Sequence, residues 1–182
     1  MVDLRLSVGR PVCIGIIGGG QLGKMLANEA RRMSFKVIIL DPTRDCPAST
    51  IADEQIVADF KDEHAIMSLA RKCDVLTYEI ELANSLALKQ LEKRNYPVRP
   101  APETLRIIQN KYRQKVFLKR HGVPVPKFEF VNSQSHLTEL CKKFGFPVVL
   151  KATEDSYDGR GNFVIRSRRD ISKAYRYFAG RE

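Results

Sequence analysis

The segment that most constrains the fold is a short apolar run that ends in three consecutive glycines. Val12–Ile17 is apolar and rich in β-branched residues, as in a buried strand, and Gly18–Gly20 then permit a tight turn. A helical pattern over residues 21–34 and a second strand at Lys36–Leu40 complete a βαβ unit, which implies a parallel sheet. The helical stripe expected to face the sheet consists of Leu22, Met25, Leu26, Ala30 and Met33.

Further elements follow this unit, and a proline cluster then interrupts them. The pattern predicts strands at 55–58 and 74–80 and helices at 62–72 and 85–94, before Pro97, Pro100 and Pro102. We therefore expect two domains, residues 1–101 and 102–182. In the second, we expect a helix from Glu103 to His121, a strand at Lys127–Val131, a helix capped by Ser133, strands at Phe146–Lys151 and Phe163–Arg166, and a helix capped by Asp170.

Composition narrows the class of protein. The net charge of +10 divides into +1 for residues 1–100 (14 basic, 13 acidic) and +9 for residues 101–182 (17 basic, 8 acidic). This asymmetry predicts a polyanionic partner for the second half, although a solvated basic helix face is an equal alternative. Nucleic acid is the weaker option, because no nucleic-acid-binding motif is visible. No apolar run approaches the length of a membrane span, and scattered cysteines without ligand spacing predict reduced thiols and a cytoplasmic protein.

A seven-residue loop, Ser156–Asn162, lies between the two last predicted strands. Its sequence is Ser-Tyr-Asp-Gly-Arg-Gly-Asn, and Lys151 ends the strand before it. The glycines allow a close backbone approach to a polyphosphate, while Arg160 offers a fork of donors that matches phosphate oxygens. An ordinary basic hairpin turn is the alternative for the loop taken alone.

Two motifs that contain acidic residues follow strands in the first half: a glycine pattern with a later aspartate, and a pair of glutamates. Gly18-x-Gly20-x-x-Gly23 with Asp41 after the next strand has the spacing of a dinucleotide fingerprint. A helix N-terminus holds any phosphate, so a phosphorylated small molecule is favoured over NAD, and glycines that serve packing only are the bland alternative. Glu79-Ile80-Glu81 places two carboxylates at a strand end, where one could reach a ligand crevice or both could be exposed.

Together these motifs resemble N5-carboxyaminoimidazole ribonucleotide synthetase, an ATP-grasp enzyme of purine biosynthesis that forms the N-terminal part of phosphoribosylaminoimidazole carboxylase in plants and fungi. The segments that carry the resemblance run in the family's order: Gly18–Met25, Leu40–Pro42, Cys46–Ala48, Asp74–Glu81, Pro102–Lys115, Phe146–Lys151 and Tyr157–Asn162. The Tyr-Asp-Gly-Arg-Gly loop argues against the related ATP-grasp formyltransferase.

The resemblance implies a fold, a reaction and a set of site residues. The fold would be a Rossmann-like pre-ATP-grasp domain followed by a small α+β ATP-grasp lid domain. ATP and bicarbonate would give carboxyphosphate, which carboxylates the amine of aminoimidazole ribonucleotide. The resemblance also allows a homodimer as the oligomeric state. By position, the ATP contacts would be Lys111, Lys151, Ser156, Tyr157, Asp158, Gly159, Arg160, Gly161 and Asn162. The ribonucleotide contacts would be Gly20, Gln21, Leu22, Glu79 and Tyr157, with Asp158 and Arg160 as catalytic residues.

The sequence departs from the family pattern in three places. Leu-Ala-Asn follows Glu81 where the family usually has His or Asn and then Val, Ser156 replaces Gly or Ala, and Thr153 stands where Arg is common. The family's C-terminal domain, which carries the magnesium carboxylates and the bicarbonate site, is not recognised in these 182 residues. We therefore expect no metal ligands here, no complete reaction by residues 1–182 alone, and a poorly fixed loop at 156–162. A non-catalytic nucleotide-binding fragment or scaffold is the alternative.

Overall fold

The computed structural model describes residues 10–154 and 161–179, and the chain forms two compact units, residues 1–106 and 107–182. No helix within the described residues is long and apolar enough to cross a membrane. Of the loop 156–162, for which we expected poor order, residues 156–160 lie outside the described residues.

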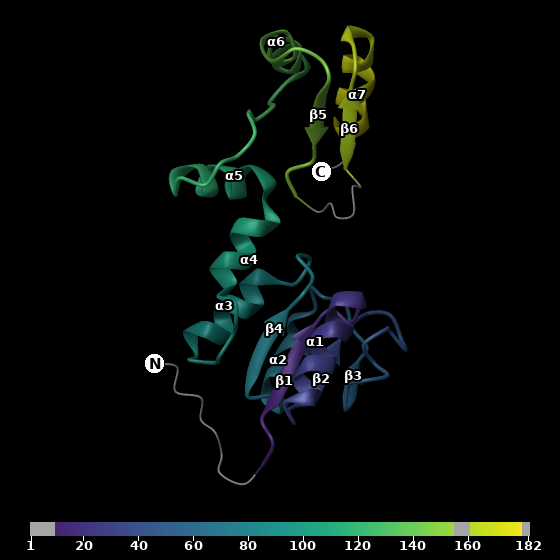
Figure 1. The fold of residues 1–182 in the computed structure, drawn as a ribbon, viewed down its shortest axis with the longest axis vertical. Coiled ribbons are helices and arrows are strands. Elements are labelled where there is room, and N and C mark those ends of the chain that lie inside the picture. The colour runs from purple at the N-terminus through teal and green to yellow at the C-terminus, as the bar shows by residue number, and fades with distance from the viewer. Residues whose placement is uncertain (1–9, 155–160, 180–182) are drawn as a thin grey trace. The chain divides into compact units, whose positions relative to one another are not determined.

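The first unit is built on a parallel sheet, as the βαβ pattern predicted. Its four strands are hydrogen bonded in the order β3-β2-β1-β4 (Figure 1). They are β1 (Cys13–Ile17), β2 (Lys36–Leu40), β3 (Glu54–Ile56) and β4 (Val75–Tyr78). Ile17 pairs with Leu40 on one side and with Tyr78 on the other, so the carboxyl ends of the three strands meet at one edge.

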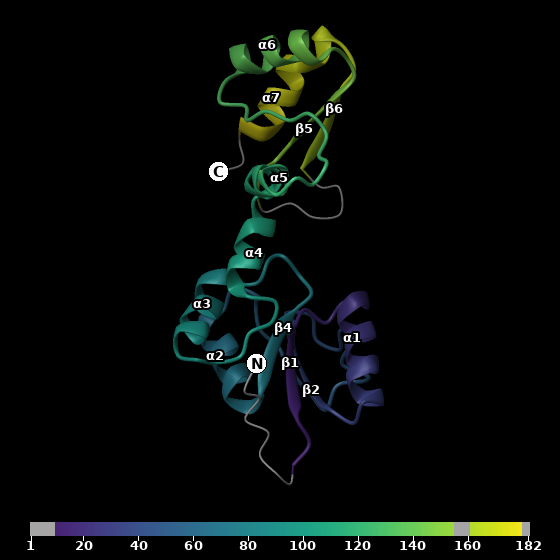
Figure 2. The same cartoon turned by 60° about the vertical axis from the view of Figure 1, so that its left-hand side comes forward.

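Helices cover both faces of this sheet. Helix α1 (Gln21–Arg32) lies against one face, and α2 (Glu63–Lys72) and α3 (Ser85–Lys93) lie against the other (Figure 2). Successive residues of a strand point to opposite faces of the sheet. Because helices cover both faces, residues pointing either way are apolar. The α1 face buries Ile16, Val37 and Ile39, and the opposite face buries Ile17, Ile38, Leu40 and Leu76.

Helix α1 contacts the sheet through a different stripe from the one predicted. Its buried residues are Gly23, Ala27 and Ala30, whereas Leu22 is 58% exposed and Met33 is 65% exposed. The prediction of an inward stripe was therefore wrong for all its members except Ala30. Small residues one turn apart let the helix lie close to the strands, and this close approach leaves its large apolar side chains on the outer surface.

The second unit packs helices against an antiparallel hairpin. Strands β5 (Val148–Lys151) and β6 (Asn162–Ile165) pair with Leu150 opposite Phe163. Its small core comprises Leu137, Cys141, Ile165, Ile171 and Ala174, which come from the hairpin and from α6 (Gln134–Phe144) and α7 (Ile171–Ala179) (Figure 1). Ser133 caps α6 by accepting from the His136 N–H, as expected, and Ser167 opens a short 3-10 turn (Arg168–Asp170) before α7.

Two expected elements of this region differ in the structure. The single helix predicted over 103–121 is two helices, α4 (Pro102–Gln109) and α5 (Lys111–Arg120). The break is at Asn110, whose extended backbone and side-chain bond to the Arg113 N–H make it the N-cap of α5. An Asn side chain can satisfy a backbone donor locally, and this competes with continuing the helix.

The strand predicted at Lys127–Val131 is an irregular segment instead. Phe128 and Phe130 pack on Tyr112 of α5, with ring centroids 5.6 and 5.5 Å away. The prediction of a strand was therefore wrong: these aromatic side chains pack on a helix instead of lying in a paired strand.

Candidate functional site

The turn after β1 is closed so tightly that Gly18, and Gly23 in the first turn of α1, leave no room for a β-carbon. Gly18 has φ +104°, and its N–H donates to the Leu40 carbonyl over 2.9 Å. A β-carbon on Gly18 would lie 2.5 Å from a carboxylate oxygen of Glu79, and one on Gly23 would lie 2.2 Å from the Gly18 carbonyl oxygen. Both distances are far below van der Waals contact, so helix α1 starts in direct contact with the turn.

Asp41 holds this turn from the end of β2. The side chain is buried, with one carboxylate oxygen accepting from the Gly19 N–H and the other from the Thr43 N–H, each over 2.8 Å. The Gly19 carbonyl accepts from the Ala48 N–H over 2.9 Å. Both carboxylate oxygens of Asp41 already accept hydrogen bonds from backbone N–H groups of the turn, so the residue stabilises the turn. This weakens the NAD interpretation, in which Asp41 would bind the ribose.

Replacing Asp41 by asparagine is expected to destabilise the first unit by about 1–3 kcal/mol, since a charge-assisted acceptor of two backbone donors is lost. Urea denaturation followed by circular dichroism measures the effect. The matched control is Asp45→Asn, an exposed residue with φ +56°, a conformation that asparagine tolerates. Equal stability of the two variants would contradict the role given to Asp41.

Glu79 lies over the same turn from the end of β4. Its N–H donates to the Ile17 carbonyl over 3.0 Å, which continues the β1–β4 pairing and fixes the residue at the carboxyl edge of the sheet. A carboxylate oxygen of Glu79 lies 3.4 Å from the position that a β-carbon on Gly20 would take, so the carboxylate faces the start of α1. Burial raises the pKa of Glu79, the backbone N–H of Gly20 opposes this rise, and the charges of Asp41 and Glu81 add to it.

The first turn of α1 offers backbone donors next to this carboxylate. Gly20 is its N-cap and supplies no side-chain hydrogen bond, and the first turn contains no acidic residue. Gln21 and Leu22, both exposed, follow directly. The structure thus brings Gly20, Gln21, Leu22 and Glu79 to one edge, with N–H groups suited to an anion and a carboxylate suited to hydroxyl or amine donors.

In the second unit, the N-terminus of α5 lies beside the end of β5. The Lys111 N–H donates to the Thr153 carbonyl over 2.8 Å, and the Asn110 amide donates to the Glu154 carboxylate over 2.6 Å. Lys151 is the last residue of β5. The two lysines expected to contact ATP phosphates therefore come from α5 and from a strand whose following residues are hydrogen bonded to the start of α5.

Sequence reasoning missed a third lysine in this region. Lys115 follows Lys111 by one helical turn, and its ammonium nitrogen lies 5.8 Å from the centre of the Phe128 ring. Burial lowers the pKa of Lys115, and the charges of Lys151 and Lys111 lower it further. The i, i+4 spacing from Lys111 was the available signal. Three positive charges that repel one another form a site suited to a polyanion.

Only the last part of the predicted ATP loop is described. Gly161 has φ +81° and accepts from the Ala152 N–H over 2.9 Å, and Asn162 pairs with Lys151 at the hairpin end. These contacts hold the end of the loop beside Lys151. The other predicted loop residues, Ser156, Tyr157, Asp158, Gly159 and Arg160, lie outside the described residues.

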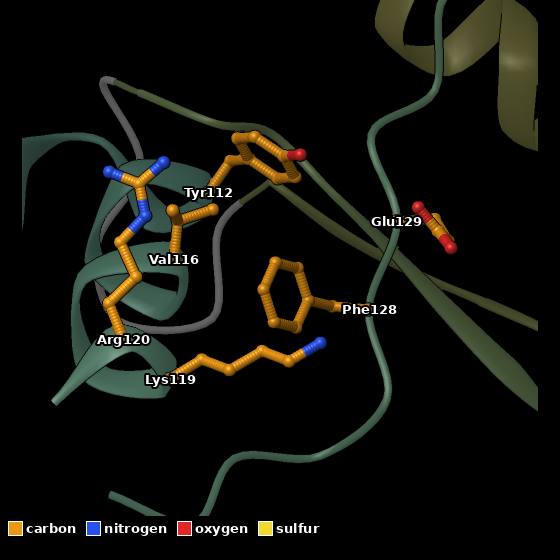
Figure 3. Close-up of a pocket in the computed structure, with 6 residues that line it drawn as sticks. All are labelled: Tyr112, Val116, Lys119, Arg120, Phe128 and Glu129. Carbon is orange, nitrogen blue, oxygen red and sulfur yellow. The ribbon is translucent and has the colours of Figure 1, made fainter. Parts of the chain in front are cut away.

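A separate hollow of about 440 Å³ lies on another part of α5 (Figure 3). Its lining residues come from α5 and from the irregular segment that follows: Tyr112, Val116, Lys119, Arg120, Phe128 and Glu129. Among the residues that the structure describes, none of those predicted to bind a ligand lines it. Among residues 10–154 and 161–179, no group of three His, Cys, Asp or Glu side chains could hold a metal ion.

Comparisons with known families match both units. A model of the ribonucleotide synthetase preATP-grasp domain matches residues 12–109, and a model of the ATP-grasp domain matches residues 116–182. The chain is 41% identical over 172 residues to a phosphoribosylaminoimidazole carboxylase of Candida glabrata, covering 92% of this chain and 30% of that protein.

Solved structures agree with this match. The structure of N5-carboxyaminoimidazole ribonucleotide synthetase from Thermotoga maritima is 47% identical with a TM-score of 0.80, covering 90% of this chain and 43% of that one. A synthase from Aspergillus clavatus, solved with ADP and 5-aminoimidazole ribonucleotide, is 34% identical with a TM-score of 0.82, covering 94% of this chain and 45% of that one. This chain therefore spans less than half the length of each of these relatives.

Proposed function

Because the chain belongs to the ribonucleotide synthetase preATP-grasp family and matches an ATP-grasp domain over residues 116–182, we propose that it serves the ATP- and bicarbonate-dependent carboxylation of 5-aminoimidazole ribonucleotide. The observation that carries the proposal is the pairing of Glu79 with the first turn of α1, whose N-cap gives no side-chain hydrogen bond. The Aspergillus clavatus relative, solved with this ribonucleotide and ADP, supports the choice of substrates. Bicarbonate as the carboxyl source and Mg²⁺ as the companion of ATP belong to the proposal.

The first unit would bind the ribonucleotide. The backbone N–H groups of Gln21 and Leu22 at the start of α1 would receive its phosphate, with the positive end of the helix dipole behind them. The Glu79 carboxylate can then accept from ribose hydroxyl or amine groups, which orients the ligand without placing a second acceptor against its phosphate. Asp41 and the glycines keep this geometry fixed before the ligand arrives.

The second unit would bind the phosphates of ATP. Lys111, Lys115 and Lys151 supply positive charge from α5 and β5, and the loop that ends at Asn162 would close over them. Arg160 and Asp158 of that loop would act at the reacting groups. When ATP is bound, Mg²⁺ would neutralise its phosphates further, and excluding water would protect an acyl phosphate from hydrolysis.

The alternative is a binding or scaffold protein without turnover. Isothermal titration of the chain with 5-aminoimidazole ribonucleotide tests the shared part of both hypotheses, and the proposal expects saturable binding at one site. Phosphate release from ATP that depends on both the ribonucleotide and bicarbonate, measured on the whole protein, separates the enzyme from the scaffold. No ribonucleotide binding would contradict both.

Replacing Lys115 by methionine is expected to weaken binding of a non-hydrolysable ATP analogue by roughly 5–20-fold, because one ammonium contact to the phosphates is lost. Fluorescence or calorimetric titration measures the dissociation constant. Lys142→Met, an exposed lysine of α6, is the matched control and should leave the affinity unchanged. If both variants weaken binding equally, the effect comes from net charge and Lys115 has no place in the site.

A further inference from the structure

Two of the four cysteines are in contact at the end of the sheet opposite the candidate ribonucleotide site. Cys13 is the first residue of β1 and Cys73 directly follows α2, and their sulfur atoms are 3.5 Å apart. Both side chains are buried. The other two thiols lie elsewhere, Cys46 in the core beneath α1 and Cys141 in the core of the second unit.

Hydrogen bonds hold the two backbones in place. The Asp74 N–H donates to the Cys13 carbonyl, and the Cys13 N–H donates to the Asp74 carboxylate, each over 2.8 Å. Arg10 adds a bond to the same carboxylate over 3.0 Å. The Tyr96 hydroxyl donates to the carbonyl of Cys73. The approach of the sulfurs therefore follows from an anchored backbone on both sides of the contact.

We propose that Cys13 and Cys73 form a site of oxidative modification, at which a small peroxide converts the two thiols into an intramolecular disulfide. A disulfide has a sulfur–sulfur length of about 2.05 Å, so the present contact requires the sulfurs to approach by about 1.5 Å. Rotation of two side chains that already meet can supply this movement. This modification site is additional to the proposed carboxylation, and the proposal for it does not depend on that activity.

The chemistry is balanced with hydrogen peroxide as the oxidant. The Cys13 thiol loses its proton, and the thiolate sulfur attacks one peroxide oxygen. The O–O bond breaks, giving a sulfenic acid, and the leaving hydroxide takes up the released proton to form water. The Cys73 sulfur then attacks the Cys13 sulfur and displaces the hydroxyl group, which leaves as water with the Cys73 proton. Overall, two thiols and one peroxide give one disulfide and two molecules of water.

The surroundings assign the first step to Cys13. The hydrogen bond with Cys73 lowers the pKa of the Cys13 thiol, and Arg10 acts in the same direction, against burial and the charges of Asp74 and Asp53. The hydrogen bond with Cys13 raises the pKa of Cys73, and burial adds to this. A thiol of lower pKa beside one of higher pKa is the arrangement expected of an attacking and a resolving cysteine.

The test treats the native chain with equimolar hydrogen peroxide, removes the peroxide, unfolds the chain in denaturant that contains N-ethylmaleimide so that the buried free thiols are blocked, and examines the digest by mass spectrometry. We expect a cross-linked peptide that joins Cys13 to Cys73, with label on Cys46 and Cys141 only. Dithiothreitol should restore labelling of all four cysteines of the sequence. Cys13→Ser and Cys73→Ser should each abolish the cross-link, whereas Cys141→Ser should leave it unchanged.

A second measurement uses the stability of the product. The bond would link positions 60 residues apart, so the oxidised chain should melt at a temperature higher by roughly 5–15 °C than the reduced chain. Label on all four cysteines after peroxide treatment would overturn the proposal, as would a sulfinic acid at Cys13 without a cross-link. Cross-links that join other pairs, or that form only in denaturant, would overturn it as well.

Discussion

Replacing Glu79 by alanine is expected to weaken binding of 5-aminoimidazole ribonucleotide by about 10–100-fold. A hydrogen bond to a charged group contributes about 1.5–3 kcal/mol, and this carboxylate is the acceptor that lies beside the first turn of α1. Isothermal titration of the wild type and the variant measures the loss. Glu81→Gln, two residues further on, is the matched control and should retain the wild-type affinity. Unchanged affinity in Glu79→Ala would remove this residue from the site.

The pH dependence gives a second readout for the same residue. Burial raises the pKa of Glu79, so its carboxylate takes up a proton at a pH above the ordinary range of glutamate. Binding that needs the charged acceptor should therefore weaken as the pH falls through this raised pKa. Glu79→Gln should lose this dependence and keep only the part due to the ligand phosphate, whose second pKa is about 6.

Folding stability should favour the neutral form of Glu79, whereas binding of the ribonucleotide should favour the charged form. Because the folded-state pKa is raised, the charged form of Glu79 is disfavoured by folding, and this cost is present at neutral pH and absent below the unfolded-state pKa of about 4.3. Glu79→Gln should therefore melt at a higher temperature than the wild type at neutral pH, with the difference shrinking in acid. A residue needed only for folding would not combine weaker binding with greater stability.

Replacing Gly23 by alanine is expected to destabilise the first unit by about 2–4 kcal/mol, which lowers its melting temperature by roughly 10–20 °C. The new β-carbon would lie 2.2 Å from the Gly18 carbonyl oxygen, a backbone atom that cannot rotate away. The sign is informative, because alanine in an exposed helix position is more favourable than glycine by about 1 kcal/mol. Thermal denaturation followed by circular dichroism measures the change.

Gly20→Ala is the control for this variant within the same turn. Its β-carbon would meet the Glu79 carboxylate at 3.4 Å, an ordinary contact, so only the cost of alanine in place of glycine at the N-cap, about 0.5–1 kcal/mol, is expected. Equal stability of Gly23→Ala and the wild type would mean that α1 does not need its close approach to the turn. The same result would remove the physical reason for the glycine at this position.

The fold class could be predicted because its signals are local. The apolar run before Gly18 and the second run at Lys36–Leu40 specify neighbouring parallel strands through pattern alone, and both are present in the sheet. The prediction of one helix over 103–121 was wrong because the Asn110 side chain accepts from the Arg113 N–H and starts a new helix. Helix propensity alone does not indicate this hydrogen bond. The strand at Lys127–Val131 was wrong because aromatic side chains pack equally well on a helix.

The sequence by itself determined the parallel sheet, the glycine turn after its first strand and the motifs that carry the family resemblance, because each of these depends on residues near one another in the chain. Only the tertiary structure decided that Asp41 holds the turn while Glu79 faces the start of α1, since both acids follow strands and differ only in what surrounds them. It also decided that Lys115 is near enough to Lys151 for their charges to repel, and that the sulfur atoms of Cys13 and Cys73 are in contact. These contacts join residues far apart in sequence, and packing of the sheet and helices sets the distances between them.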